Sequence, residues 1–137
     1  MKLKIITQER IVFDNEVDEI YTRGVDGEFG ILKGHIPVMA ALDIGITKVK
    51  TGNDTLLYTT MGGILQFKDE ECLILTTAAE AGDEIDELRA KESLDRAKKR
   101  LKEAKARIDA KRAEAAIARA EARLKAKLGD QVHISEG

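Results

Sequence analysis

The sequence predicts an α+β fold: an antiparallel β-sandwich over residues 1–84, followed by an antiparallel hairpin of two helices over residues 85–137. Nine of the eleven glycines precede Ile85, and none lies between Asp83 and Leu128. The apolar residues change period at the same place, from strand alternation to the steps of three and four that a helix requires. The charge changes too: the chain up to Ile85 carries 8 Lys/Arg and 15 Asp/Glu (net −7), and the rest carries 15 and 10 (net +5). Opposite charges indicate two modules with different partners.

The first module is a series of short apolar segments separated by turn residues, which is typical of an antiparallel sandwich or barrel. Charged and apolar residues alternate in EVDEIYTR, as expected of a strand with one solvated face. GVDGEFG and TGND supply turn residues. The predicted strands read KLKIITQ, RIVFDN, EVDEIYTR, GITKVKT, DTLLYTTM, GGILQFK and EECLILTT. Cys72, the only cysteine, lies in the last of these and is expected to be a buried thiol.

The second module contains two apolar stripes at helical spacing. The first consists of Leu94, Ala97, Leu101, Ala104 and Ile108, and the second of Ala110, Ala113, Ile117, Ala120 and Leu124. The step from Ile108 to Ala110 is too short for both stripes to share one face of a straight helix. Asp109 stands at this break and is a favourable N-cap for a second helix. We therefore expect a hairpin, held weakly because alanine buries little area at roughly 25 cal/mol per Å². A continuous helix of about 40 residues is the alternative.

The composition bounds the class of protein. Hydrophobic residues make up 43% of the chain but aromatic residues only 4%, so the core must be aliphatic. No apolar segment approaches the roughly 20 residues that a membrane-spanning helix needs. No signal peptide precedes the first predicted strand. We therefore expect a soluble, intracellular protein.

The sequence offers little chemistry for catalysis. The two serines, Ser93 and Ser135, and the two histidines, His35 and His133, show no pattern of a nucleophile with its base. The glycines at positions 24, 27 and 30 are wrongly spaced for a dinucleotide fingerprint, and there is no P-loop or Cys/His cluster. An enzyme acting alone and a metal site are therefore not predicted. Nucleic acid is disfavoured as a partner by the scarcity of aromatic residues and the acidic first module.

Arginines form a row on each predicted helix. The first row consists of Arg89, Arg96, Arg100 and Arg107, and the second of Arg112, Arg119 and Arg123. Arg119 and Arg123 are one turn apart and repel each other unless an anion lies over them. If the hairpin folds, the two rows converge and present guanidinium groups suited to phosphate. A solvated basic face is the alternative.

The segment EIDELRAKES begins the second module. Asp86 is placed to accept hydrogen bonds from the first amide groups of a helix, and Arg89 is three residues further on, within reach of an ion pair. Taken alone, the segment therefore indicates an ordinary helix start.

The longer segment GVDGEFGILKGHIPVMAALDIG resembles the hallmark segment of the epsilon subunit of bacterial proton-translocating (rotary) ATP synthase. The order of parts also agrees over nearly the whole chain, with a strand-rich module before an alanine-rich helical pair. Lys33 departs from the pattern, because relatives commonly have proline there, which affects a turn.

The resemblance implies a regulatory ATP site. Epsilon subunits that bind ATP carry an Ile/Leu-Asp-x-x-Arg-Ala motif where the helices begin, and residues 85–90 of this chain match it. In the family, arginines of the second helix complete the site, and a glutamate upstream lies on its adenine side. The residues that the resemblance assigns to ATP are Glu80, Ile85, Asp86, Arg89, Ala90, Arg119 and Arg123. It carries no expectation about Mg²⁺.

The resemblance also implies a role and partners. The sandwich is expected to attach to the gamma subunit and the c-ring, with Glu28 facing the c-ring and His35 facing gamma, and to help couple rotation to proton flow. The helices are expected to alternate between a compact hairpin and an extended form that reaches the catalytic alpha and beta subunits and inhibits ATP hydrolysis. Such a subunit is not itself catalytic and is peripheral to the cytoplasmic face of the bacterial cell membrane. A static stalk connector that senses no nucleotide is the alternative.

Overall fold

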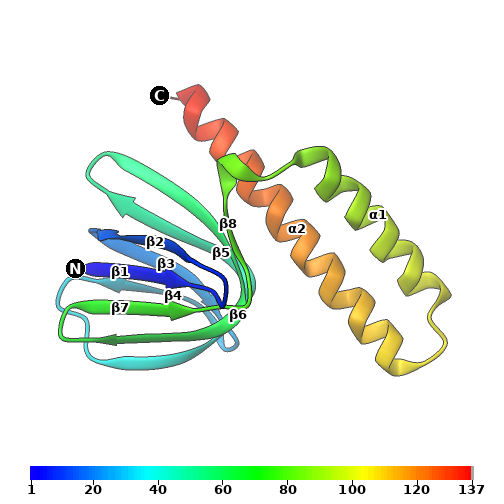
Figure 1. Ribbon diagram of the computed structural model, residues 1–137, viewed down its shortest axis with the longest axis horizontal. Helices are drawn as coiled ribbons and strands as arrows, with labels where there is room; N and C mark the ends of the chain where they lie inside the picture. Colours follow the sequence, from blue (N-terminus) through cyan, green and yellow to red (C-terminus); the bar gives the residue numbers. More distant parts are fainter. Residues whose placement is uncertain (137) are drawn as a thin grey trace.

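The computed structural model describes the backbone of residues 1–136 and the side chains of residues 1–129, so His133 and Ser135 lie outside the described side chains. Strands occupy one end of the molecule and two long helices the other (Figure 1). The strands are β1 Lys2–Ile6, β2 Ile11–Glu16, β3 Glu19–Gly24, β4 Gly27–Leu32, β5 Val38–Thr51, β6 Asp54–Lys68, β7 Glu71–Leu75 and β8 Ala79–Ala81. The helices are the 3₁₀ turn η1 Gly82–Glu84, α1 Glu87–Glu103 and α2 Arg107–Glu136. The predicted order of a sandwich and two helices is confirmed.

The strands form a sheet in the order β2-β1-β7-β6-β5-β3-β4, with β8 paired to β6 away from this path. Neighbouring strands in the described chain run antiparallel, with the exception of β1 and β7, which are parallel. The prediction of a wholly antiparallel sandwich is wrong for this pair. Hairpin signals between consecutive segments cannot reveal it, because β1 and β7 lie far apart in the sequence.

The strands β5 and β6 are long and pass through both layers of the sandwich. GITKVKT is the second half of β5, and DTLLYTTM and GGILQFK are continuous in β6. Gly62 and Gly63 lie in β6 with φ of 77° and 113°, angles that favour glycine. Beyond these glycines β6 pairs with β7, and before them it pairs with β8. The two glycines thus bend a strand where the sequence suggested that one strand ended and another began. The strands β4 and β8 were not predicted.

The sandwich encloses an aliphatic core, as the composition predicts. Its fully buried side chains include Leu3, Ile20, Leu65 and Phe67. Cys72 belongs to the same core cluster and is 2% exposed, which confirms the predicted buried thiol. This core is separate from a smaller cluster at the base of the helices.

The helices form the predicted antiparallel hairpin, and α2 lies between α1 and the strands (Figure 1). Alanine forms the buried surface of α1 at Ala90 and Ala97. On α2 the buried alanines are Ala113, Ala120, Ala122 and Ala126. Small side chains therefore allow the helices to approach closely, while contributing little buried area each. Within the described residues, neither helix is long and apolar enough to cross a membrane.

The break between the helices falls earlier than predicted. Helix α1 ends at Glu103 and α2 begins at Arg107, so Asp109 lies in the first turn of α2 and is not its N-cap. An aspartate in the first turn interacts favourably with the helix dipole, much as an N-cap does, and the sequence does not distinguish the two positions. Ile108 was assigned to the apolar stripe of the first helix, but it belongs to α2 and is 60% exposed. Arg107 likewise belongs to α2, and not to the arginine row of the first helix.

Candidate functional site

A pocket of about 280 Å³ lies where β8, η1 and the start of α1 meet α2. It is lined by Glu80, Glu84, Ile85, Asp86, Arg89, Ala90, Ser93 and Arg123. Six of the seven residues that the sequence assigns to ATP are therefore brought together, although they come from segments more than forty positions apart. Arg119 does not line this pocket.

Asp86 is the N-cap of α1. Its backbone is extended, with φ of −84° and ψ of 107°, and its Oδ1 accepts a hydrogen bond from the backbone N–H of Arg89 at 3.1 Å. A cap of this kind stabilises a helix by about 1 kcal/mol. No Asp86–Arg89 ion pair within 4.0 Å is present among the described side chains. The helix-start interpretation is thus confirmed for Asp86, whereas the ion pair with Arg89 that the spacing allows is not formed.

Ile85 and Ala90 form the floor of the pocket. Each is 3% exposed, and both pack with Ala126 of α2 in the small apolar cluster at the base of the hairpin. Ile46 of β5 packs against this cluster. The small cluster therefore holds the start of α1, α2 and the sheet together, and it orients the polar side chains around it.

Glu80 and Arg123 form the charged wall of the pocket. Arg123 Nε donates to Glu80 Oε1 at 2.8 Å, and both side chains are about one-third exposed. Close by, Lys127 Nζ donates to the carbonyl oxygen of Asp83 at 3.3 Å. These bonds join α2 to β8 and η1, so Arg123 lines the pocket only while α2 lies against these elements.

Ser93 and Glu84 complete the pocket and were not assigned from the sequence. Ser93 Oγ accepts from Arg96 Nη2 at 3.1 Å, and Glu84 forms an ion pair with Arg10 at 3.6 Å. Ser93 is one helical turn beyond Arg89, so the spacing of the motif was sufficient to find it. Glu84 precedes the helix, where no periodicity places its side chain.

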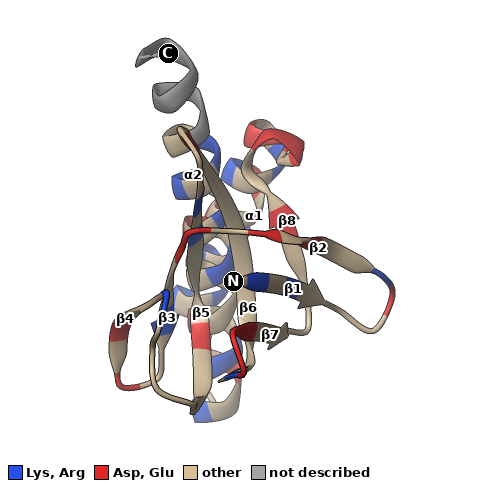
Figure 2. Cartoon of the chain, turned by 90° about the vertical axis from the view of Figure 1, so that its left-hand side faces the viewer, with Lys and Arg blue, Asp and Glu red and all other residues tan. Residues whose placement is uncertain are grey.

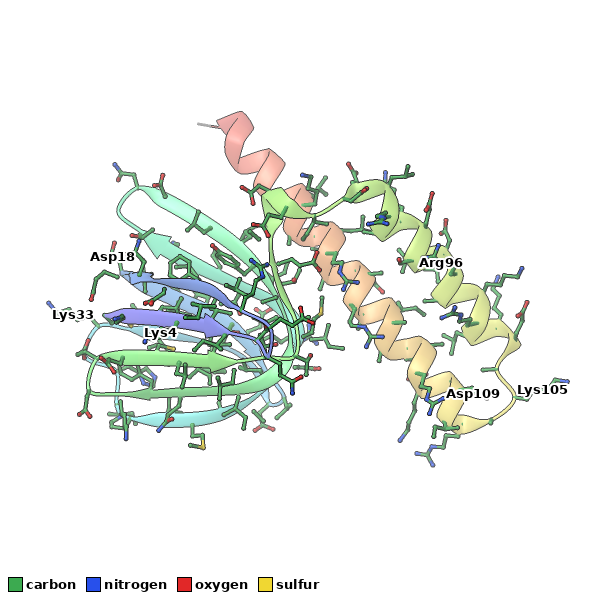
Figure 3. All side chains as sticks on the ribbon, in the orientation of Figure 1. Lys4, Asp18, Lys33, Arg96, Lys105 and Asp109 are labelled. Carbon is green, nitrogen blue, oxygen red and sulfur yellow. The ribbon has the colours of Figure 1, made fainter. Side chains whose placement is uncertain are left out.

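Arg119 lies in a second hollow between the helices, which we call the arginine trough. The trough has a volume of about 520 Å³ and shares no lining residue with the pocket around Asp86. Its lining residues are Arg100, Glu103, Ala104, Asp109, Arg112, Ala113, Ala116 and Arg119. Figure 2 shows that Lys and Arg recur along both helices. Figure 3 shows Asp109 near the loop that joins the two helices, and Arg96 midway along α1.

The two residues assigned to partner contacts lie on the sandwich and away from this pocket. Glu28 is exposed on β4, opposite Arg23 of β3, and borders a crevice between the sheet and α2. His35 is half-buried in the loop after β4, where its ring makes a T-shaped contact with the ring of Phe67, with the two centroids 5.9 Å apart. Its Nδ1 lies 2.6 Å from the carbonyl oxygen of Ile36.

The pocket combines carboxylates with guanidinium groups. Its carboxylates accept hydrogen bonds from N–H groups, and the Arg89 guanidinium attracts an anion. Ser93 has no histidine beside it among the lining residues. Within the described residues, no group of three His, Cys, Asp or Glu side chains is placed to hold a metal ion.

Known proteins of one family share this architecture. The chain matches the model of the β-sandwich domain of the ATP synthase delta/epsilon chain over residues 1–82, and that of its long α-helix domain over residues 83–127. The ATP synthase epsilon chain of Carboxydothermus hydrogenoformans is 43% identical over 100 residues, which cover 73% of this chain and 75% of that protein. That of Anoxybacillus flavithermus is 40% identical over 100 residues, with the same coverage of 73% and 75%.

A solved structure agrees with these matches. A chain in the cryo-EM structure of the Euglena gracilis mitochondrial ATP synthase, comprising OSCP, F1 and the c-ring in rotational state 1, has a TM-score of 0.78 to this chain. Its sequence identity is 25%, and the match covers 96% of this chain and 80% of that chain. Two consecutive domain matches and identities of 40% and above show that this chain belongs to the ATP synthase delta/epsilon chain family, among its epsilon chains.

Proposed function

We propose that this epsilon chain works in the central stalk of a proton-translocating ATP synthase, where its sandwich helps to couple rotation to proton flow and its hairpin inhibits ATP hydrolysis in a manner controlled by ATP. The observation that carries the proposal is the pocket at the joint of β8, η1, α1 and α2, which gathers Asp86, Arg89 and Arg123 only in the folded hairpin. The chain itself has no catalytic role in this proposal.

ATP acts on the hairpin by binding its closed form alone. Alanine stripes hold α1 and α2 together weakly, so an open form lies close in free energy. A ligand that bridges Arg89 on α1 and Arg123 on α2 favours closure by about 2.7 kcal/mol at a hundredfold excess over its Kd. High ATP therefore keeps the helices folded, and low ATP releases them to inhibit hydrolysis.

The ligand orientation follows from the charges of the pocket. Asp86 and Glu80 are carboxylates that accept hydrogen bonds and repel phosphate, so they face the adenine end. In this proposal Asp86 and Arg89 act together on the adenine side, and Arg119 and Arg123 of α2 attract the phosphates.

Family membership and the division into two modules support the proposed partners. The sandwich binds the gamma subunit through the region of His35 and the c-ring through the region of Glu28. The extended helices, with their excess of positive charge, reach the alpha and beta subunits of the catalytic head. In this proposal the chain is a peripheral component at the cytoplasmic face of the bacterial cell membrane. Cysteines substituted for Glu28 and His35 are expected to crosslink to the c-ring and gamma, and capture of neither removes these two contacts from the proposal.

The first test is calorimetric titration of the full chain with ATP. Arg89→Gln is expected to weaken ATP binding by about tenfold, because a charge-assisted hydrogen bond is lost. Lys98→Gln is the matched control, with the same loss of charge on an exposed residue of α1 that does not line the pocket. Asp86→Asn separates the cap from the carboxylate charge, since asparagine caps a helix as well as aspartate does. Unchanged ATP affinity in both Arg89→Gln and Asp86→Asn contradicts the site.

The second test asks whether binding moves the helices. A distance between labels on the sandwich and near Leu128 is expected to shorten when ATP is added. One observation favours the static connector: the polar groups of the pocket already have partners without a ligand. Asp86 caps α1, and Glu80 accepts a hydrogen bond from Arg123 at 2.8 Å. A distance that ignores ATP while calorimetry shows binding supports the static connector.

A further inference from the structure

Ser93 differs in chemistry from the other polar residues that line the pocket around Asp86. Those other side chains are carboxylates or guanidinium groups. Ionised carboxylates only accept hydrogen bonds and guanidinium groups only donate them, whereas a serine hydroxyl can do both. Ser93 is half-buried on α1, one turn beyond Arg89, and the sequence motif assigns it no role. Its hydroxyl is therefore a neutral contact in a pocket whose other polar contacts are charged.

Arg96 determines which role the hydroxyl of Ser93 plays. Its Nη2 donates to Ser93 Oγ at 3.1 Å from three residues along the same helix, so the oxygen is engaged as an acceptor. A serine inside a helix can instead donate its hydrogen to the backbone carbonyl oxygen four residues earlier. Among the hydrogen bonds of the described side chains, Ser93 Oγ takes part in the one from Arg96 and in no such bond to the backbone. The hydrogen is thus left to donate to a ligand, and the bond from Arg96 strengthens this donor by polarising the hydroxyl.

The position of Ser93 along α1 indicates which part of a nucleotide it meets. Asp86 and Arg89, which act on the adenine side in the proposed function, precede it on the same helix. Arg123 lines the pocket from α2, and Arg119 lies in the arginine trough towards the end of α1. A nucleotide with its base beside Asp86 and its distal phosphates towards these two arginines passes Ser93 with its ribose and its α-phosphate.

We propose that Ser93, positioned by Arg96, donates a hydrogen bond to an oxygen atom in the sugar–phosphate part of the nucleotide. This inference rests on the proposed function and adds to it a contact that depends on a hydroxyl and not on charge. A ribose hydroxyl and the α-phosphate each present an oxygen that accepts such a bond. Loss of the serine hydroxyl leaves that oxygen without its partner, so the contact favours ligands that carry the oxygen in the right place.

The test is calorimetric titration of the Ser93→Ala chain with ATP. This variant is expected to bind ATP about fivefold more weakly than the wild type, because one neutral hydrogen bond is lost. Alanine is the most favourable residue in a helix, so α1 is expected to stay folded, which helical circular dichroism checks before titration. Ser93→Thr keeps the hydroxyl and is expected to keep most of the affinity.

Arg96→Ala tests the positioning role. Alone, this variant is expected to weaken ATP binding by about twofold, because the hydroxyl loses its orientation, and in the Ser93→Ala background it is expected to have no further effect. Lys98→Ala is the matched control, since it removes one positive charge from an exposed residue of α1 that does not line the pocket. Equal weakening by Arg96→Ala and Lys98→Ala, with and without the Ser93 hydroxyl, shows a general effect of charge and contradicts positioning by Arg96.

A chemical double-mutant cycle identifies the oxygen of the ligand. ATP is compared with two deoxy analogues, each lacking one of the ribose hydroxyls, in the wild type and in Ser93→Ala. If loss of one ribose hydroxyl removes the effect of Ser93→Ala, that hydroxyl is the acceptor. If the effect persists with both analogues, and AMP shows it while adenosine does not, the acceptor is an α-phosphate oxygen. Each of these two results supports the contact.

Two results overturn the contact, and they differ in what they say about the proposed function. Unchanged ATP affinity in Ser93→Ala, in a chain whose ATP binding depends on Arg89, removes the contact and leaves the proposed function standing. Absence of ATP binding by the wild-type chain refutes the proposed function, and the contact is refuted with it.

Discussion

Glu80 and Arg123 form a pair between β8 and α2, two elements that the chain does not join directly. A partly buried pair at 2.8 Å is expected to couple by about 1 kcal/mol in a double-mutant cycle of Glu80→Gln and Arg123→Gln, measured by thermal unfolding without ligand. The exposed pair of Glu87 and Lys91 within α1, at 3.3 Å, serves as the comparison and is expected to couple by about 0.3–0.5 kcal/mol. Equal coupling in the two cycles contradicts a special role for the Glu80–Arg123 pair in holding the hairpin to the sheet.

Tyr58 gives the protein a pH dependence in the alkaline range. Burial raises the pKa of its hydroxyl above 10.0, and the charges of Asp83 and Glu84 raise this pKa further, while Arg10 opposes them. Because the pKa is higher in the folded chain, the neutral phenol stabilises the fold fully below pH 10, and this contribution is lost as the pH rises through the folded pKa.

Tyr58→Phe is therefore expected to lose less stability than the wild type when the pH is raised above 10.0. Urea unfolding on either side of that pH measures the difference. Tyr21, the other tyrosine, also has a raised pKa, chiefly because it donates to Glu19, so some alkaline loss persists in the variant. The same alkaline loss in both proteins contradicts the assignment to Tyr58.

At the scale of the elements, the bend in β6 depends on a glycine. Gly63 has φ of 113°, and a Cβ there collides with the carbonyl oxygen of Leu75 in the neighbouring strand. Gly63→Ala is expected to destabilise the sandwich by roughly 3 kcal/mol or more, since the clash involves backbone that cannot move aside. Gly52 in the β5–β6 turn is the control: it also has positive φ, at 60°, but has open space around it. Gly52→Ala is expected to cost about 1 kcal/mol, and equal melting temperatures for the two variants contradict the bend as the cause.

Local patterns predicted the elements better than their ends. Alternation placed the strands around Leu3, Ile20 and Cys72 correctly, because one face of each strand is buried. The pair Gly62–Gly63 was taken as a boundary, since a glycine that bends a strand and a glycine that ends one are alike in sequence. The end of α1 was misplaced for a similar reason, because Asp109 suits the first turn of a helix as well as its cap.

The candidate site was predictable to the same extent. The four motif residues, Ile85, Asp86, Arg89 and Ala90, line one pocket because they are close together at the start of α1. Periodicity assigned Arg119 and Arg123 to one flank of α2, which is correct, but it does not fix how far α2 is offset along α1. Ala97 and Ala120 are buried in the hairpin, and in the assembled hairpin Arg119 lies outside the pocket that Arg123 lines. Only the assembled hairpin shows the separation.

At the scale of the whole molecule, the two modules have separate cores, and α1 packs on α2 (Figure 1). Cys72 reports on the first module alone, because burial suppresses its reactivity and raises the pKa of its thiol to about 12. Ala97→Asp places a charge between the helices and is expected to lower the helical circular dichroism by opening the hairpin.

Cys72 is expected to react with a thiol reagent as slowly in Ala97→Asp as in the wild type, and quickly in both only after the sandwich unfolds. Leu65→Ala, within the sandwich core, is the contrasting variant and is expected to speed the reaction. Fast labelling of Cys72 in Ala97→Asp contradicts independent modules and indicates one cooperative unit.

The short strand β8 makes the weakest strand pairing at the joint between the sandwich and the hairpin. It is a three-residue strand that pairs with β6, and the chain continues from it through η1 into α1. By contrast, β5 and β6 pair along almost their whole length. A force that pulls the hairpin away from the sandwich therefore acts on this short pairing and on the contacts of α2 with β5 and β6. The sandwich keeps its own strands, and β8 can pair again when the force is removed. Opening of the joint is therefore expected to separate β8 from β6 while the β5–β6 pairing stays intact.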